Sequence, residues 1–101
     1  MPVTVTLAGR AMTALISGEI DHHGAREIMN ALDREIDAAL PNFLELDLSG
    51  VTFMDSSGIA VLLRAHRRLS ELDGKLTVRS IPTQPRKVLD AAGVGRIISL
   101  Q

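Results

Sequence analysis

The segment from residue 43 to residue 72 changes from the period of a strand to the period of a helix within a few residues. Leu44, Leu46 and Leu48 alternate with acidic residues, which is typical of a strand with one apolar and one polar face. From residue 59 the apolar residues recur at intervals of three and four, which predicts a helix whose polar face carries arginines. Asp55-Ser56-Ser57-Gly58 joins the two elements, so these four residues should lie at a helix N-terminus.

These four joining residues favour a helix cap, and they hold more hydroxyl groups than a cap requires. Asp55 or Ser56 suits the N-cap position, because either side chain can accept hydrogen bonds from the free backbone N–H groups of the first turn. The helix macrodipole also presents partial positive charge there. Since a cap uses one side chain, at least one of the two adjacent hydroxyls, on Ser56 and Ser57, is not needed to cap the helix.

Ahead of this segment the sequence predicts a hairpin and a first helix. Residues 3–7 and 11–16 alternate apolar and polar side chains, so two strands joined by a short turn should pair antiparallel. The strand pattern breaks at residues 18–21. Asp21 is a plausible N-cap for a helix that begins within the next two residues and stops before Pro41.

The C-terminal part of the chain predicts a further strand and helix. Gly74 suits the left-handed position that ends a helix, and residues 76–78 read as a short strand. A helix with Pro85 in its first turn follows, and residues 97–100 form a last strand or an extended tail. The order of elements predicts one α/β domain over residues 1–101. We expect a mixed sheet of four to five strands, with helices packed mainly on one face.

The composition argues against nucleic-acid binding, membrane spanning and thiol chemistry. The formal net charge is -1 and only 2% of the residues are aromatic, so the chain has neither a basic footprint nor a platform for stacking bases. The absence of cysteine removes disulfides, Cys-ligated zinc and thiol catalysis. No apolar run approaches the roughly 20 residues needed to cross a bilayer, and no secretory signal precedes the first strand. We therefore expect a cytoplasmic protein.

Two kinds of enzymatic site can be weighed against the residues, a serine hydrolase and a metal centre. Ser57 lies at a strand-to-helix turn, but its context is D-S-S-G rather than G-x-S-x-G, and so short a chain leaves little material for a substrate pocket. The sequence leaves open whether a histidine acts as a base. His22 and His23 are adjacent and face different directions on a helix, and His66 falls on an apolar stripe. We expect neither catalysis nor a bound metal or cofactor.

Two motifs resemble those of a known regulatory family. FMDSSGIAVLL at residues 53–63 and GEIDHH at residues 18–23 strongly resemble the STAS domains of bacterial anti-anti-sigma factors, in the expected order and spacing. The resemblance covers nearly the whole chain and implies a STAS-like domain over residues 1–101. In that family the second serine of the D-S-S-G motif accepts a phosphoryl group from the anti-sigma factor, which is itself a protein kinase. That position is Ser57 here.

The resemblance implies a switch that works through binding. The unphosphorylated form would bind an anti-sigma factor with serine kinase activity and so release a sigma factor, and a metal-dependent serine phosphatase would reset the protein. Asp55 is expected to orient the hydroxyl or the kinase, Ser56 to act mainly as a cap, and Gly58 to leave the hydroxyl uncovered. The domain itself would catalyse nothing and would contact neither nucleic acid nor membrane. The expected partner-binding residues are Asp21, Asp55, Ser56, Ser57 and Gly58.

Two other functions stay open at this level. One is a cytoplasmic STAS subunit of an ABC-type membrane transporter, in which the serine need not be modified. The other is a scaffold component of a stress-signalling complex. The motif matches the switch pattern without departure, which favours the switch. We also expect the fold to tolerate a phosphate on Ser57, because free N–H donors at a helix start accommodate anions.

Overall fold

A five-stranded mixed sheet forms the centre of residues 2–101, the part of the chain that this computed structural model describes. The strands lie in the order β1-β2-β3-β4-β5. The first pair is antiparallel and every later pair is parallel, so the predicted mixed sheet is confirmed. Along the chain the elements are β1 (Val3–Ala8), β2 (Ala11–Ile20), α1 (His22–Ala39), β3 (Phe43–Met54), α2 (Ser56–Glu71), β4 (Lys75–Arg79), α3 (Thr83–Ala91), the 3-10 turn η1 (Val94–Arg96) and β5 (Ser99–Leu100).

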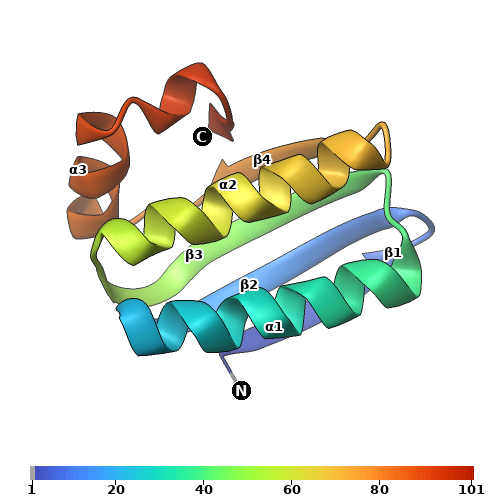
Figure 1. The fold of residues 1–101 in the computed structure, drawn as a ribbon, viewed down its shortest axis with the longest axis horizontal. Helices are drawn as coiled ribbons and strands as arrows, with labels where there is room; N and C mark the ends of the chain where they lie inside the picture. The colour runs from blue at the N-terminus through green and yellow to red at the C-terminus, as the bar shows by residue number, and fades with distance from the viewer. Residues whose placement is uncertain (1) are drawn as a thin grey trace.

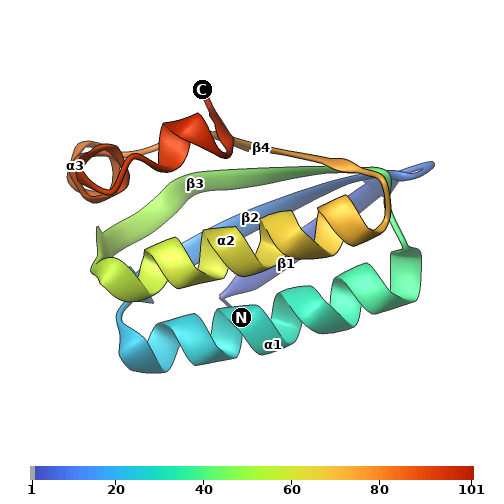
Figure 2. The ribbon, with the colours of Figure 1, turned by 45° about the horizontal axis from the view of Figure 1, so that its top comes forward.

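Helices α1 and α2 lie side by side across one face of the sheet (Figure 1). Turned by 45°, both helices are seen on the same side of the strands, while α3 lies at one end of the sheet (Figure 2). The prediction that helices cover mainly one face is therefore confirmed. Because each helix follows a strand of the parallel part of the sheet, α1 and α2 begin at the same edge of the sheet (Figure 1).

The core between the sheet and these helices is aliphatic. Leu44, Leu46 and Leu48 of β3 are buried on the helix-covered face, as their alternation predicts. Helix α1 contributes residues at intervals of three and four, including Ile28 and Ile36, both fully buried. Neither phenylalanine belongs to the core, so its packing depends on Leu, Ile, Val, Ala and Met.

The acidic residues that alternate with the buried leucines lie on the opposite face of the sheet, where they form ion pairs. Arg79 on β4 lies 2.9 Å from Glu45 and 3.5 Å from Asp47, both on β3. Partial burial alone would raise the pKa of Asp47, but the Ser49 N–H, donated at 2.9 Å, and the charge of Arg79 outweigh it. The pKa of Asp47 is therefore held below its ordinary value.

Two predicted details of the chain path are wrong. Strand β2 does not break at residue 18 but continues to Ile20, because the parallel ladder with β3 extends to the pair Ile20 and Met54 and absorbs two register shifts on the way. The left-handed residue after α2 is Asp73, with φ 56°, rather than Gly74. Gly74 is needed for space instead, since a Cβ there would lie 2.8 Å from the carbonyl oxygen of Asn42.

The predicted starts and stops of the helices are otherwise confirmed. Asp21 caps α1, which ends at Ala39, ahead of Pro41. Helix α3 carries Pro85 in its first turn. Residues 99 and 100 pair with β4, so the end of the chain is a short strand rather than a free tail.

Helix α3 is tied to the end of β3 by one side chain. The Oε1 atom of Gln84 accepts the Met54 N–H at 2.8 Å, and its Nε2 donates to the Met54 carbonyl at 2.7 Å. The amide thus continues the ladder of β3 where no strand does. Since Met54 directly precedes Asp55, this contact fixes the backbone at the start of the D-S-S-G motif.

We predict that Asp47→Asn destabilises the domain at neutral pH and not in acid. A folded-state pKa below the unfolded value gives stability that is present above about pH 4 and is lost as the pH falls through the lowered pKa. Thermal unfolding at pH 7 should show a loss of about 1 kcal/mol or less, and the difference from wild type should shrink as the pH falls below 4. Asp90→Asn, at an exposed position on α3, is the control. An Asp47→Asn deficit that is equal at pH 7 and pH 2.5 would contradict the ion-pair explanation.

We predict that Gln84→Ala lowers the free energy of unfolding by about 1–3 kcal/mol, because it leaves two backbone groups of Met54 without partners. For a domain of this size that corresponds to a fall in melting temperature of about 5–15 °C. Lys87→Ala, an exposed change on the same helix, should stay near wild type. Equal melting temperatures for the two variants would show that the Gln84 contact does not stabilise the fold.

Candidate functional site

The site lies where the carboxyl ends of β2 and β3 meet. Ile20 and Met54, the last residues of these parallel strands, are paired, and the Asp55 N–H donates to the Ile20 carbonyl at 3.2 Å. An aspartate follows each strand end directly, Asp21 before α1 and Asp55 before α2. The two motifs, whose aspartates are 34 residues apart along the chain, are thereby brought to one edge of the sheet.

Each aspartate caps its own helix. Asp21 Oδ1 accepts the Gly24 N–H at 2.8 Å, and Asp55 Oδ1 accepts the Ser57 N–H at 2.7 Å. Ser56 is the first residue of α2 and is exposed, so the interpretation of Ser56 as the cap is wrong. Asp55 is preferred because its backbone is extended, as an N-cap requires.

The helix start at Ser57 offers fewer free donors than the sequence suggests. The Ser57 N–H is accepted by the Asp55 carboxylate, and the Gly58 N–H donates to the Asp55 carbonyl at 3.0 Å. The expectation that unpaired N–H groups at this position receive an anion is therefore wrong for these two residues. The carboxylate that caps the helix already occupies the place where an anion would lie.

Gly58 is buried and has a packing role. A Cβ at this position would lie 2.6 Å from Met54 Sδ and 2.9 Å from Met54 Cε. The missing side chain lets α2 start directly above the end of β3, with the Met54 side chain beneath it. This close approach holds the first turn of α2, and with it Ser57, against the sheet. A contact of Gly58 with a partner stays a prediction.

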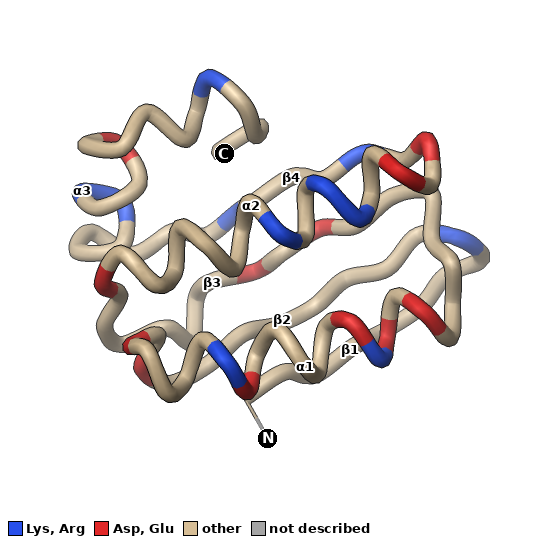
Figure 3. The backbone as a smooth tube through the Cα atoms, viewed as in Figure 1, with Lys and Arg blue, Asp and Glu red and all other residues tan. Residues whose placement is uncertain are grey.

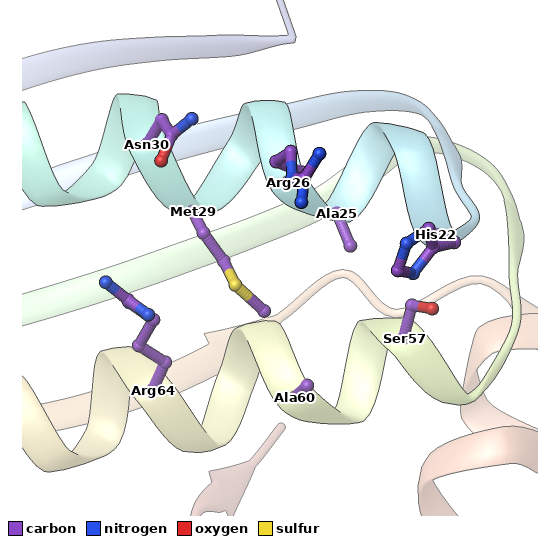
Figure 4. Close-up of a pocket in the computed structure, with 8 residues that line it drawn as sticks. All are labelled: His22, Ala25, Arg26, Met29, Asn30, Ser57, Ala60 and Arg64. Carbon is purple, nitrogen blue, oxygen red and sulfur yellow. The ribbon is translucent and has the colours of Figure 1, made fainter.

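A groove between α1 and α2 opens beside Ser57. Its volume is about 360 Å³, and it combines an apolar part from Ala25, Met29 and Ala60 with a polar part from both helices. Figure 4 shows the Ser57 side chain next to the His22 ring at one end of this groove. No hydrogen bond joins them within residues 2–101, so the oriented base that a serine nucleophile needs is not formed there. The polar residues lining the groove are His22, Arg26, Asn30, Ser57 and Arg64.

Ion pairs hold the two helices together beyond the groove. Arg64 of α2 donates to Asp33 of α1 at 2.7 Å, and Arg68 donates to Asp37 at 2.6 Å. Figure 3 shows this arrangement as basic segments of α2 opposite acidic segments of α1. The hydrogen bond with Asp33 raises the pKa of Arg64 above its ordinary value.

Most of the residues singled out from the sequence lie together at the site, but not all of them do. Asp21, Asp55, Ser56 and Ser57 gather at one edge of the sheet, where they are exposed or half-buried. His23 turns away and contacts Glu27 on its own helix at 3.1 Å. Among residues 2–101 no group of three or more His, Cys, Asp or Glu side chains is arranged to hold a metal ion. None of the helices described is long and apolar enough to span a membrane.

Three residues near the site were not predicted from the sequence: Arg26, Met29 and Gln84. The first two line the groove. Their positions carry a weak signal, because residues three or four apart share one face of a helix and Arg26 lies four residues after His22. The contact of Gln84 with Met54 joins residues 30 apart and has no local signal.

Comparisons with known proteins agree on one family. The family model described as the STAS domain matches residues 3–101. The chain is 31% identical to the anti-sigma F factor antagonist of Lysinibacillus sphaericus over 78 residues, which cover 77% of this chain and 67% of that protein.

Two solved structures have a similar fold. The anti-sigma factor antagonist SpoIIAA in its unphosphorylated form gives a TM-score of 0.81 at 23% identity, covering 98% of this chain and 87% of that one. The Bacillus cell fate determinant SpoIIAA in the phosphorylated form gives 0.73 at 22% identity, covering 98% and 90%. With a family match over almost its full length, a relative above 30% identity and this fold, the chain belongs to the STAS domain family.

Proposed function

We propose that this protein is an anti-sigma factor antagonist that is switched by reversible phosphorylation of Ser57. Its unphosphorylated form binds an anti-sigma factor that has serine kinase activity, and the sigma factor is released. The names of its relatives support this reading. One observation in the structure carries it: Ser57 stands at the first turn of α2, half-buried at the mouth of a groove, with its backbone held by Asp55 and its hydroxyl unbonded within residues 2–101.

The domain supplies the acceptor hydroxyl, and the kinase supplies the bound ATP and the base. In the forward step Ser57 Oγ attacks the γ-phosphorus of ATP held by the anti-sigma factor. The new O–P bond forms as the bond from that phosphorus to the β,γ-bridging oxygen breaks, ADP leaves, and the hydroxyl proton passes to a base on the kinase. In the reverse step a metal-dependent serine phosphatase directs water onto the same phosphorus, which restores the hydroxyl and releases inorganic phosphate.

The surface around Ser57 suits a partner that packs against a neutral hydroxyl. Leu63 is 36% exposed on α2, and it lies with Met29 and Ala60 on the side of the helices that continues from Ser57. A phosphate adds about -1.5 to -2 charge at neutral pH, which a packed partner would have to desolvate or oppose with its own charges. Phosphorylation therefore blocks the interface directly. Asp21 and Ser56, at the same edge of the sheet, are proposed partner contacts.

We predict that Ser57→Ala removes phosphate labelling by the cognate anti-sigma kinase and binds that kinase permanently, because it keeps a small side chain and loses the acceptor oxygen. Ser57→Asp should bind at least tenfold more weakly. The measurements are mass spectrometry of the Ser56/Ser57 peptide and calorimetric binding. Ser56→Ala is the matched control and should be labelled like wild type. Phosphate recovered on Ser56, with Ser57→Ala still fully labelled, would show that Ser57 is not the acceptor. Wild-type binding by both Ser57 variants would instead favour the transport-subunit alternative.

We predict that phosphorylation leaves the fold nearly unchanged. The first turn of α2 is held against the sheet by the packing of Gly58 on Met54, and a group on the Ser57 hydroxyl, at the mouth of the groove, does not disturb this contact. The melting temperatures of the two forms should agree within about 5 °C, which corresponds to about 1 kcal/mol for a domain of this size. Amide NMR shift changes should stay near α1, α2 and the ends of β2 and β3. Changes that reach β4 and β5 would indicate a conformational switch instead.

A further inference from the structure

The surroundings of Ser57 raise a question about where a phosphate on its hydroxyl would lie. On the side of its own helix the Asp55 carboxylate accepts the Ser57 N–H at 2.7 Å, and the Asp55 carbonyl accepts the Gly58 N–H. A phosphate turned toward this side would meet a carboxylate at close range instead of free donors. Like charges at such a distance repel strongly in a partly buried setting. The phosphate is therefore directed away from the cap of α2.

The other direction leads across the groove to α1. His22 and Arg26 line the groove opposite Ser57, one helical turn apart on the same face of α1 (Figure 4). The guanidinium of arginine presents a planar fork of N–H donors that matches two phosphate oxygens. Histidine adds a further ring N–H donor. Both residues are exposed, so neither side chain has to break packing to turn toward Ser57.

The two arginines that line the groove differ in whether an acidic side chain already binds them. Arg64 is held by Asp33 through two hydrogen bonds, of 2.7 and 3.5 Å. Arg26 forms no ion pair with any acidic side chain among residues 2–101. Arg26 is thus the groove arginine whose donors remain available for a new anion.

The acidic groups at this end of the helices have their own partners. Asp21 accepts the Gly24 N–H, Asp55 accepts the Ser57 N–H, and Glu27 contacts His23. Their negative charge weakens the attraction of the site for a free anion. A phosphate that is covalently attached to Ser57 does not need to be recruited, so a modest attraction to α1 decides its orientation.

We infer that Arg26, with His22 beside it, receives the phosphoryl group of phosphorylated Ser57 and turns it into the groove between α1 and α2. This inference rests on the proposed phosphorylation of Ser57. The captured phosphate bridges the two helices and covers the apolar part of the groove. The phosphorylated surface then differs from the unphosphorylated one in shape as well as in charge.

The test uses full-length protein carrying phosphoserine at position 57 by genetic encoding, so that its outcome does not depend on any kinase. Titration by phosphorus NMR measures the second pKa of the phosphate, which is about 6 for an isolated phosphoserine. Contact with a guanidinium favours the dianion. Because nearby carboxylates raise this pKa, the comparison is between variants: we expect the phosphate pKa to be at least about 0.5 lower in the wild-type background than in Arg26→Gln, with His22→Gln in between.

Arg34→Gln is the matched control, since Arg34 lies on the same helix outside the groove and is exposed. It should leave the phosphate pKa at the wild-type value. The unphosphorylated Arg26→Gln protein should melt within about 2 °C of wild type, which shows that the variant is folded.

Two results would overturn the inference: a phosphate pKa in Arg26→Gln that equals the wild-type value, or Arg26→Gln and Arg34→Gln values that agree. Either result leaves the switch itself intact if Ser57→Ala and Ser57→Asp still separate in binding. A depressed phosphate pKa that Arg26→Gln restores supports the capture even where the binding experiments fail, so the two hypotheses fail independently.

Discussion

The position of Ser57 depends on one residue, Met54, at the end of β3. Its backbone pairs with Ile20 on one side and with the amide of Gln84 on the other, and its side chain fills the space that Gly58 leaves. These three contacts come from β2, α3 and α2. The start of α2 is therefore fixed by the sheet and by the C-terminal helix, and the half-buried Ser57 that stands on it has a defined place.

Parallel pairing of β2 and β3 places the start of α1 beside the start of α2, and so adds the residues of α1 to the site. Because the strands end at the same edge, the helices that follow them begin side by side, each with its own aspartate cap. Parallel ladders require a crossover helix, so the pairing that builds the core also lays α1 beside α2. The edge that brings Asp21 next to Asp55 is a consequence of topology rather than of any contact between the two side chains.

Much of this was predictable, and two of the features that were missed have a common cause. The alternation at Leu44, Leu46 and Leu48 and the helical spacing after residue 58 are local signals of burial, and they predicted the sheet, the helices and the helix start at the motif. The continuation of β2 to Ile20 was missed because it depends on a partner strand. The same holds for Gln84, whose contact with Met54 spans the chain. Signals that arise only after the elements meet are absent from any single segment.

The groove between α1 and α2 has a simple determinant. Beyond it the helices are joined by charged pairs, whereas the groove itself is lined by Ala25 and Ala60, whose methyl groups leave the space unfilled. Ala60 is exposed, and neither the sheet nor the caps require it to be small. A substitution at Ala60 can accordingly change the depth of the groove without entering the buried core, to which Ala25 belongs. A scaffold of this kind can keep its switch residue in place while the surface next to it diverges to suit different partners.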